Sequence, residues 1–196
     1  MDNIKVLENF LDQEYQDELE RLIGDEYFPL YMRTHTVVYA DKHSPYYWED
    51  KSTQEGIVFC HAFLKDNNEV STYYEAVDRL ATIFLITTGL ALFPRRIRFN
   101  LTTTDANYGG DKHYTPHIDT DYEGGCTAIY YVNDSDGDTL FFKTPDEKDK
   151  TKDLEVIKRL TPKKGTLVYF PRDTIHAGQP PVNTPCRAVI NLNFAP

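Results

Sequence analysis

Two stretches in the N-terminal half repeat apolar residues every three to four positions, the period of an amphipathic helix. The first stretch has Asp12 as an expected N-cap and Gly24 as a stop signal. The second stretch can start at Ser71 and is closed by Gly89 and Pro94. We therefore expect two helices in the N-terminal half of the chain.

Between these helices, and throughout the chain after Pro94, the pattern changes to short β-branched and aromatic runs, which are typical of strands. Turn sequences rich in glycine, proline and aspartate separate the runs. The candidate strands are residues 34–40, 57–64, 96–104, 114–119, 127–133, 139–143, 154–160, 166–170 and 187–194. Many short strands at roughly even spacing predict a β-sandwich or barrel-like roll, here with helices packed on one face.

Composition narrows the class of protein. The chain has 196 residues, 40% of them hydrophobic, which suits one domain with a packed core. Its formal net charge of −10 argues against broad binding to nucleic acid or to anionic membranes. The longest apolar stretch, residues 83–93, is too short to span a bilayer, and the first residues lack a secretory signal pattern. Three widely spaced cysteines favour a reducing compartment, so we expect a cytoplasmic protein.

Candidate metal ligands begin at His117 and Asp119. In an extended segment, residues two apart point to the same side, so an imidazole and a carboxylate can chelate one ion. His176, near the end of a later strand pattern, can return as a third ligand, and this donor set suits Fe(II), Mn or Zn. Asp121 is an alternative to Asp119, although the two-residue spacing favours Asp119. A surface strand with two polar side chains remains the structural alternative.

Arg187 opens the last candidate strand, which is otherwise nearly uncharged. A planar guanidinium binds a carboxylate through two hydrogen bonds, so its position makes a dicarboxylic cosubstrate plausible. An ion pair at the edge of a strand is the alternative explanation.

The ordered set His117-x-Asp119, His176 and Arg187 resembles the Fe(II)/2-oxoglutarate-dependent dioxygenases, most of all their prolyl-4-hydroxylase-like branch. Residues 127–133 resemble the strand after the His-x-Asp motif, and residues 136–141 resemble the hairpin that follows it. The chain is particularly similar to short oxygenases of tailed phages, which would place it in the host cytoplasm.

The resemblance implies one dioxygenase domain over residues 1–196. Residues 95–196 would form a double-stranded β-helix core, jelly-roll or cupin-like. Residues 1–94 would supply N-terminal helices, packed on one face of that core, and supporting strands. The fold class expected is thus mainly β with supporting helices.

The resemblance also implies the chemistry. His117, Asp119 and His176 would hold Fe(II), and 2-oxoglutarate would bind the metal and place its distal carboxylate on Arg187 and the hydroxyl of Tyr131. With O2 as cosubstrate and ascorbate as a candidate reductant, oxidative decarboxylation to succinate and CO2 would be coupled to hydroxylation of a substrate. Tyr131 as an ordinary core aromatic stays an open alternative.

Two positions depart from the family pattern. Family members often place a tyrosine on the strand before the first ligand to contact 2-oxoglutarate, whereas Tyr108 lies in a glycine-rich loop here. Tyr108, Asn100 and Thr102 are therefore the candidates for this contact with 2-oxoglutarate. Asn193 stands where several relatives carry a tryptophan.

The first expected substrate is a prolyl residue in a peptide or protein, and a small-molecule substrate is also open. We expect the protein itself to be a monomer or a homodimer. An AlkB-like demethylase of nucleic acid is one alternative, disfavoured by the acidic chain and by Asn193 in place of a second arginine. A β-roll binding domain without turnover is the other alternative. The polar, aromatic segment 41–56 is a candidate substrate lid.

Overall fold

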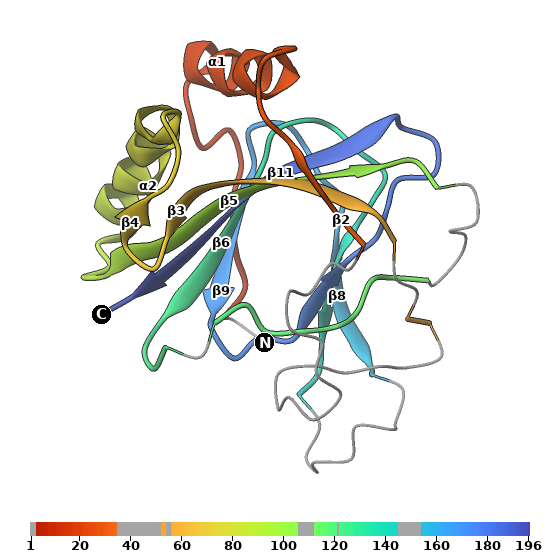
Figure 1. Ribbon diagram of the computed structural model, residues 1–196. Coiled ribbons are helices and arrows are strands. Elements are labelled where there is room, and N and C mark those ends of the chain that lie inside the picture. Colours follow the sequence, from red (N-terminus) through yellow and green to blue (C-terminus); the bar gives the residue numbers. More distant parts are fainter. Residues whose placement is uncertain (1–2, 35–51, 54–55, 106–111, 121, 145–153) are drawn as a thin grey trace.

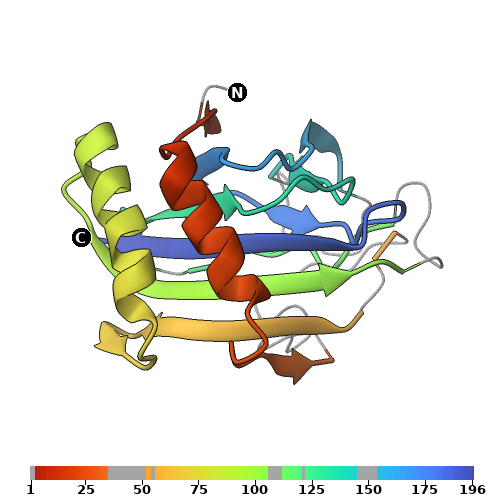
Figure 2. The same cartoon turned by 90° about the horizontal axis from the view of Figure 1, so that it is seen from above.

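Two antiparallel sheets form the body of the protein, and two helices cover the outer face of the larger sheet (Figures 1 and 2). The computed structural model describes residues 3–34, 52–53, 56–105, 112–120, 122–144 and 154–196. Among these residues, none of the helices is both long and apolar enough to cross a membrane.

The first six strands along the chain belong to the larger sheet, and the later strands are divided between the two sheets. The larger sheet has the order β1 (Lys5–Leu7), β9 (Leu167–Pro171), β6 (Cys126–Tyr131), β11 (Cys186–Ala195), β5 (Phe93–Thr103), β3 (Val58–Lys65) and β2 (Tyr31–Arg33), with β4 (Asn68–Glu69) beside β3. The smaller sheet has the order β10 (His176–Gly178), β7 (Thr139–Phe142) and β8 (Val156–Leu160). This mainly β jelly-roll arrangement confirms the fold class expected from the sequence.

The central strand β11 separates the two sides of the larger sheet. Its side chains alternate, so Ala188, Ile190, Leu192 and Phe194 pack in the cluster that includes helix residues. Arg187, Val189 and Asn191 point to the opposite side, where they line a cavity inside the roll. The same strand therefore supports the helices with one face and builds the candidate site with the other.

Both helices form where their local signals indicate, with one shift. The Asp12 carboxylate accepts a hydrogen bond from the Tyr15 backbone N–H at 2.9 Å and caps α1 (Gln13–Gly24). Helix α2 (Tyr74–Thr88) ends at Gly89, whose φ of 67° is left-handed. It begins after the expected Ser71, because the Ser71 hydroxyl accepts a hydrogen bond from the Tyr73 N–H in a turn.

The candidate strand over residues 114–119 is wrong. This segment is instead tied to the rest of the fold at single residues, and His117 pairs with His176 in an isolated bridge. Pro116 has no N–H, so a continuous ladder cannot form there. Most of the candidate strand at 34–40 and of the candidate lid at 41–56 lies outside the described residues. Sequence periodicity also missed β1, β2, β4 and β10, which have only two or three residues each.

Candidate active site

Three side chains with metal-binding atoms meet inside the roll. One ligand atom from each of His117, Asp119 and His176 lies within 4.8 Å of the others. The Asp119 carboxylate is 3.6 Å from His117 Nε2 through Oδ1 and 3.4 Å from His176 Nε2 through Oδ2. The two histidines are held together by reciprocal backbone hydrogen bonds of 2.9 and 3.0 Å. Residues far apart in sequence are thus joined at one point by the backbone itself.

The backbone also orients both imidazole rings. His117 Nδ1 lies 2.8 Å from the carbonyl oxygen of Thr115, and His176 Nδ1 lies 3.1 Å from that of Thr174. Because a carbonyl oxygen only accepts, each Nδ1 carries the proton in these bonds. Nε2 of each ring faces the Asp119 carboxylate and is then the atom available to a metal ion, as is usual for histidine ligands.

Two neighbours hold the carboxylate between the rings. Arg96 donates to Asp119 Oδ1 at 3.2 Å, and Asn191 donates through Nδ2 to Asp119 Oδ2 at 2.8 Å. Burial by itself would raise the pKa of Asp119, but the adjacent His117 and His176 and the Arg96 guanidinium outweigh it and hold the pKa well below its usual value. The carboxylate is therefore ionised and fixed in orientation.

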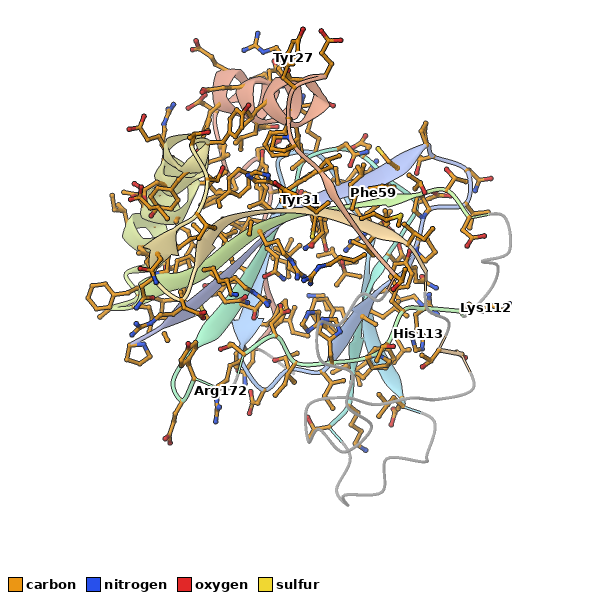
Figure 3. The ribbon with its side chains drawn as sticks, viewed as in Figure 1. Tyr27, Tyr31, Phe59, Lys112, His113 and Arg172 are labelled. Carbon is orange, nitrogen blue, oxygen red and sulfur yellow. The ribbon has the colours of Figure 1, made fainter. Side chains whose placement is uncertain are left out.

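The three residues open into a cavity between the sheets with an empty volume of about 570 Å³, its mouth included. Figure 3 shows side-chain nitrogen atoms, in blue, gathered in this interior, while His113 lies on the segment that leads to His117. The polar lining also includes Arg98, Asn100, Thr102, Thr139, Arg187 and Asn191. Thr139 comes from β7, and strands β5 and β11 contribute the other five residues at alternate positions.

Arg187 lies in the wall of this cavity and is 7% exposed. Its Nε donates to the Gly137 carbonyl at 2.9 Å, and one Nη2 hydrogen bond of 2.7 Å reaches the Thr139 hydroxyl. Burial lowers the pKa of Arg187. The guanidinium is thus desolvated and held in one orientation, as an anion-binding group requires.

Tyr131 lies behind the cavity wall and contacts it through Thr139. Its ring is fully buried, its hydroxyl donates to Thr139 Oγ1 at 2.8 Å, and the Arg187 guanidinium lies 5.9 Å from the ring centroid. Thr139, which lines the cavity, therefore stands between the Tyr131 hydroxyl and any ligand held there.

The other residues singled out from the sequence do not all line the cavity. Asn100 and Thr102 both line the cavity, and the buried Oδ1 of Asn100 has no hydrogen-bond partner among the described residues. Asn193 bonds through Oδ1 to Arg96 and through Nδ2 to Thr127 instead. Tyr108 and Asp121 lie outside the described residues.

Sequence reasoning missed three polar residues of the site, namely Arg96, Arg98 and Asn191. All three lie on β5 or β11 at even spacing from residues that it had singled out. Charged residues repeated at every second position of a central strand were the available signal, because such a strand is normally apolar on its buried face.

Comparisons with known proteins agree with this geometry. Residues 104–195, which include all three clustered residues and Arg187, match the family described as the 2OG-Fe(II) oxygenase superfamily. A search of curated proteins returns no match.

Solved structures share the fold along nearly the whole chain. A 2OG-Fe(II) oxygenase family oxidoreductase from Burkholderia pseudomallei has a TM-score of 0.67 at 14% identity, covering 98% of this chain and 85% of that one. The Trichoplax adhaerens prolyl hydroxylase, in complex with a hypoxia inducible factor peptide fragment, has a TM-score of 0.63 at 15% identity, covering 100% and 84%. A Pseudomonas putida prolyl-4-hydroxylase has a TM-score of 0.55 at 18% identity, covering 99% and 93%.

The family pattern thus lies on the half of the chain that carries the clustered histidines and aspartate, and the fold extends over the rest. The family is defined by an oxygenase reaction that uses Fe(II) and 2-oxoglutarate. Residues 104–195 of the protein match the 2OG-Fe(II) oxygenase superfamily, and the whole chain shares the fold of solved oxygenases of that type.

Proposed function

We propose that the protein is a hydroxylase whose iron is held by His117, Asp119 and His176. The observation that carries this proposal is the buried meeting of two imidazole Nε2 atoms with one oriented carboxylate. Two histidines and one carboxylate on a single face suit Fe(II) and leave coordination positions for other ligands. The donor chemistry of the residues therefore fits the metal that the family uses.

The protein contributes orientation and charge to this centre. The Thr115 and Thr174 carbonyls keep the Nδ1 protons of His117 and His176 away from the metal position. Arg96 and Asn191 keep the Asp119 carboxylate aligned through their hydrogen bonds to its two oxygens. Bound Fe(II) and 2-oxoglutarate supply oxidative decarboxylation to succinate and CO2, which drives hydroxylation of the substrate by O2.

Arg187 is the proposed partner of the distal carboxylate of 2-oxoglutarate. Its buried guanidinium lies in the cavity wall with Thr139, whose hydroxyl is oriented by Tyr131. A charged hydrogen bond gains strength in such a desolvated place, because water does not compete for either partner. Asn100 and Thr102 face the same space and are further candidate contacts.

A prolyl residue of a peptide or protein is the first substrate to test. The likeness in fold to prolyl hydroxylases from Trichoplax adhaerens and Pseudomonas putida supports this choice, and the first of these was solved with a peptide fragment.

The test is an anaerobic titration of the metal-free protein with Fe(II) and 2-oxoglutarate, followed through the visible metal-to-ligand charge-transfer band. The wild-type protein and an Asp173→Ala control, which removes an exposed carboxylate near His176, should both develop the band. Asp119→Ala should not, because it removes the only anionic ligand of the proposed set. Absence of the band in wild type, or its full development in Asp119→Ala, would overturn the assignment.

A further inference from the structure

A second arginine lies in the cavity without an anion. Arg98 lines the cavity from β5, and its buried Nε has no hydrogen-bond partner among the described residues. A buried cation without a partner costs free energy, so proteins rarely keep one unless a ligand or ion offsets it. The environment of Arg98 therefore indicates a missing anion.

Charges around Arg98 strengthen this conclusion. Burial, first, and the nearby Arg96 and Arg33 lower the pKa of Arg98 to about 10, so it remains protonated at neutral pH. Asp119 is the acidic group that attracts it, but that carboxylate already accepts hydrogen bonds from Arg96 and Asn191. The thiol of Cys60 is a further ionisable group that acts on Arg98. A wall this basic is unusual in a chain with a net charge of −10.

Strand register separates Arg98 from the proposed 2-oxoglutarate anchor. Arg98 is paired with Asn191 across β5 and β11, whereas Thr102 is paired with Arg187. Four residues along a strand correspond to roughly 13 Å between the two pairs. 2-Oxoglutarate has two carboxylates, and the proposed function assigns one to Arg187 and the other to the metal. Neither is left for Arg98.

An unused acceptor lies directly beside this unused cation. Asn191 donates through Nδ2 to Asp119, which fixes the direction of its amide, and its buried Oδ1 has no hydrogen-bond partner in the described part of the chain. Asn100, next along the same face of β5, also presents a buried Oδ1 without a partner. Amide oxygens accept hydrogen bonds from an ammonium group, and a guanidinium binds a carboxylate.

We infer that the primary substrate is a free amino acid, or the terminal residue of a chain, whose α-carboxylate pairs with Arg98 and whose nitrogen donates to Asn191 Oδ1. This inference rests on the proposed function, because it takes Arg187 and the metal as the places of the two 2-oxoglutarate carboxylates. It narrows the prolyl hypothesis to proline with a free carboxylate and separates it from a prolyl residue inside a peptide.

The experiment uses the anaerobic Fe(II)–2-oxoglutarate complex of the full chain and needs no turnover. L-Proline and L-prolinamide are titrated first, then the other proteinogenic amino acids and their amides, and the change in the charge-transfer band is recorded. At least one free acid should perturb the band, with its amide binding more weakly by about tenfold or more, the loss of one charged hydrogen-bonded pair.

Three variants assign the effect to Arg98. Arg98→Met should keep the Fe(II)–2-oxoglutarate band, which shows that it folds, and should lose the response to the free acid. Arg98→Lys should recover part of the response, because it restores the charge without the planar donor pair. Arg21→Met changes the net charge equally on the exposed side of α1 and should behave as wild type.

Several results would overturn the inference. Equal perturbation by acids and amides, no perturbation by any acid, or an unchanged response in Arg98→Met would each remove the assigned carboxylate site. A loss of 2-oxoglutarate affinity in Arg98→Met would assign this arginine to the cosubstrate instead. Failure of the proposed function gives a different result, since no band would form before any amino acid is added.

Discussion

At the scale of single residues, the two ends of the cavity differ in how their polar groups are satisfied. At one end, Arg187 donates hydrogen bonds to the Gly137 carbonyl and the Thr139 hydroxyl, and the Tyr131 hydroxyl also donates to Thr139. Around Arg98 and Asn191, buried polar atoms remain without partners among the described residues. The first end is preorganised to orient an anion, and the second depends on a ligand to complete it.

Replacement of Arg187 by methionine tests the first end. We expect 2-oxoglutarate to bind about 1.5–3 kcal/mol more weakly, because a charged, desolvated hydrogen-bond partner is lost while the side-chain volume is largely kept. The dissociation constant is measured by titrating 2-oxoglutarate against the charge-transfer band of the anaerobic Fe(II) protein. Arg21→Met is the matched control, and an unchanged affinity in Arg187→Met would mean that another residue holds the distal carboxylate.

At the scale of elements, helix α1 is stabilised by packing on the sheet, by an N-terminal cap and by two ion pairs. Tyr15 and Leu19 are buried in the cluster beneath the helix. Lys164 reaches from the turn before β9 to Asp17 and Glu20, at 2.6 Å from each carboxylate. Because those acids are exposed, the two ion pairs contribute little, and the helix depends more on its buried face and its N-terminal cap.

Removal of the cap tests this ranking. Asp12→Ala should lower the free energy of unfolding by about 1 kcal/mol, since the Tyr15 N–H loses its side-chain acceptor. Urea denaturation followed by circular dichroism measures the change. Asp12→Asn, which removes the charge and keeps an acceptor, should stay close to wild type; equal losses in both variants would show that charge, not capping, matters here.

The turn between β6 and β7 is braced by Asp136, which accepts hydrogen bonds from the backbone N–H groups of Val182, Asn183 and Thr184. Desolvation would raise the pKa of Asp136, but these bonds and the Thr184 hydroxyl outweigh it and hold the pKa below its usual value. The adjacent Gly137 supplies the carbonyl that accepts from Arg187. The hydrogen bonds of Asp136 therefore hold the turn whose next residue orients Arg187 at the proposed cosubstrate end of the cavity.

The lowered pKa of Asp136 predicts that the folded protein loses stability in acid. The folded protein holds Asp136 ionised more strongly than the unfolded chain does, so this contribution is present above about pH 4 and is lost as the pH falls further. Denaturation from about pH 6 to about pH 3 should show a steeper loss in wild type than in Asp136→Asn. Parallel curves for the two proteins would contradict the prediction.

At the scale of the whole molecule, the proposed metal site joins parts of the chain that lie far apart in sequence. His117 and His176 are joined by backbone bonds, and Asp119 is held by residues of β5 and β11. An ion bound to all three ligands therefore binds the folded chain and not the unfolded one, and must stabilise the whole fold.

Metal and cosubstrate should raise the thermal stability of the protein together. At a free ligand concentration of about 100 times its dissociation constant, the gain is about 2.7 kcal/mol. Differential scanning calorimetry with Mn(II) and 2-oxoglutarate, compared with chelator-treated protein, measures the shift in Tm. Asp119→Ala should show little shift; an equal shift in that variant would place the metal elsewhere.

Local sequence patterns were enough to predict several elements of the fold and the candidate metal ligands. The capped helix after Asp12, the helix stop at Gly89 and the last strand over residues 187–194 were predicted from neighbouring residues, and the structure has all three. His117, Asp119 and His176 were singled out from spacing and from likeness to a family, and the structure brings them together. Sequence by itself thus determined the fold class and the candidate ligands.

Tertiary structure alone decided which other residues share the cavity. Arg98 meets Asn191 only because β5 and β11 pair in one particular register, and a slip of β11 by one residue would turn Asn191 toward the helices and away from Arg98. The segment before Asp119 is held by single bridges in place of the expected strand, because Pro116 interrupts the ladder. Register between distant strands follows from packing of the whole core, which periodicity along one segment does not contain.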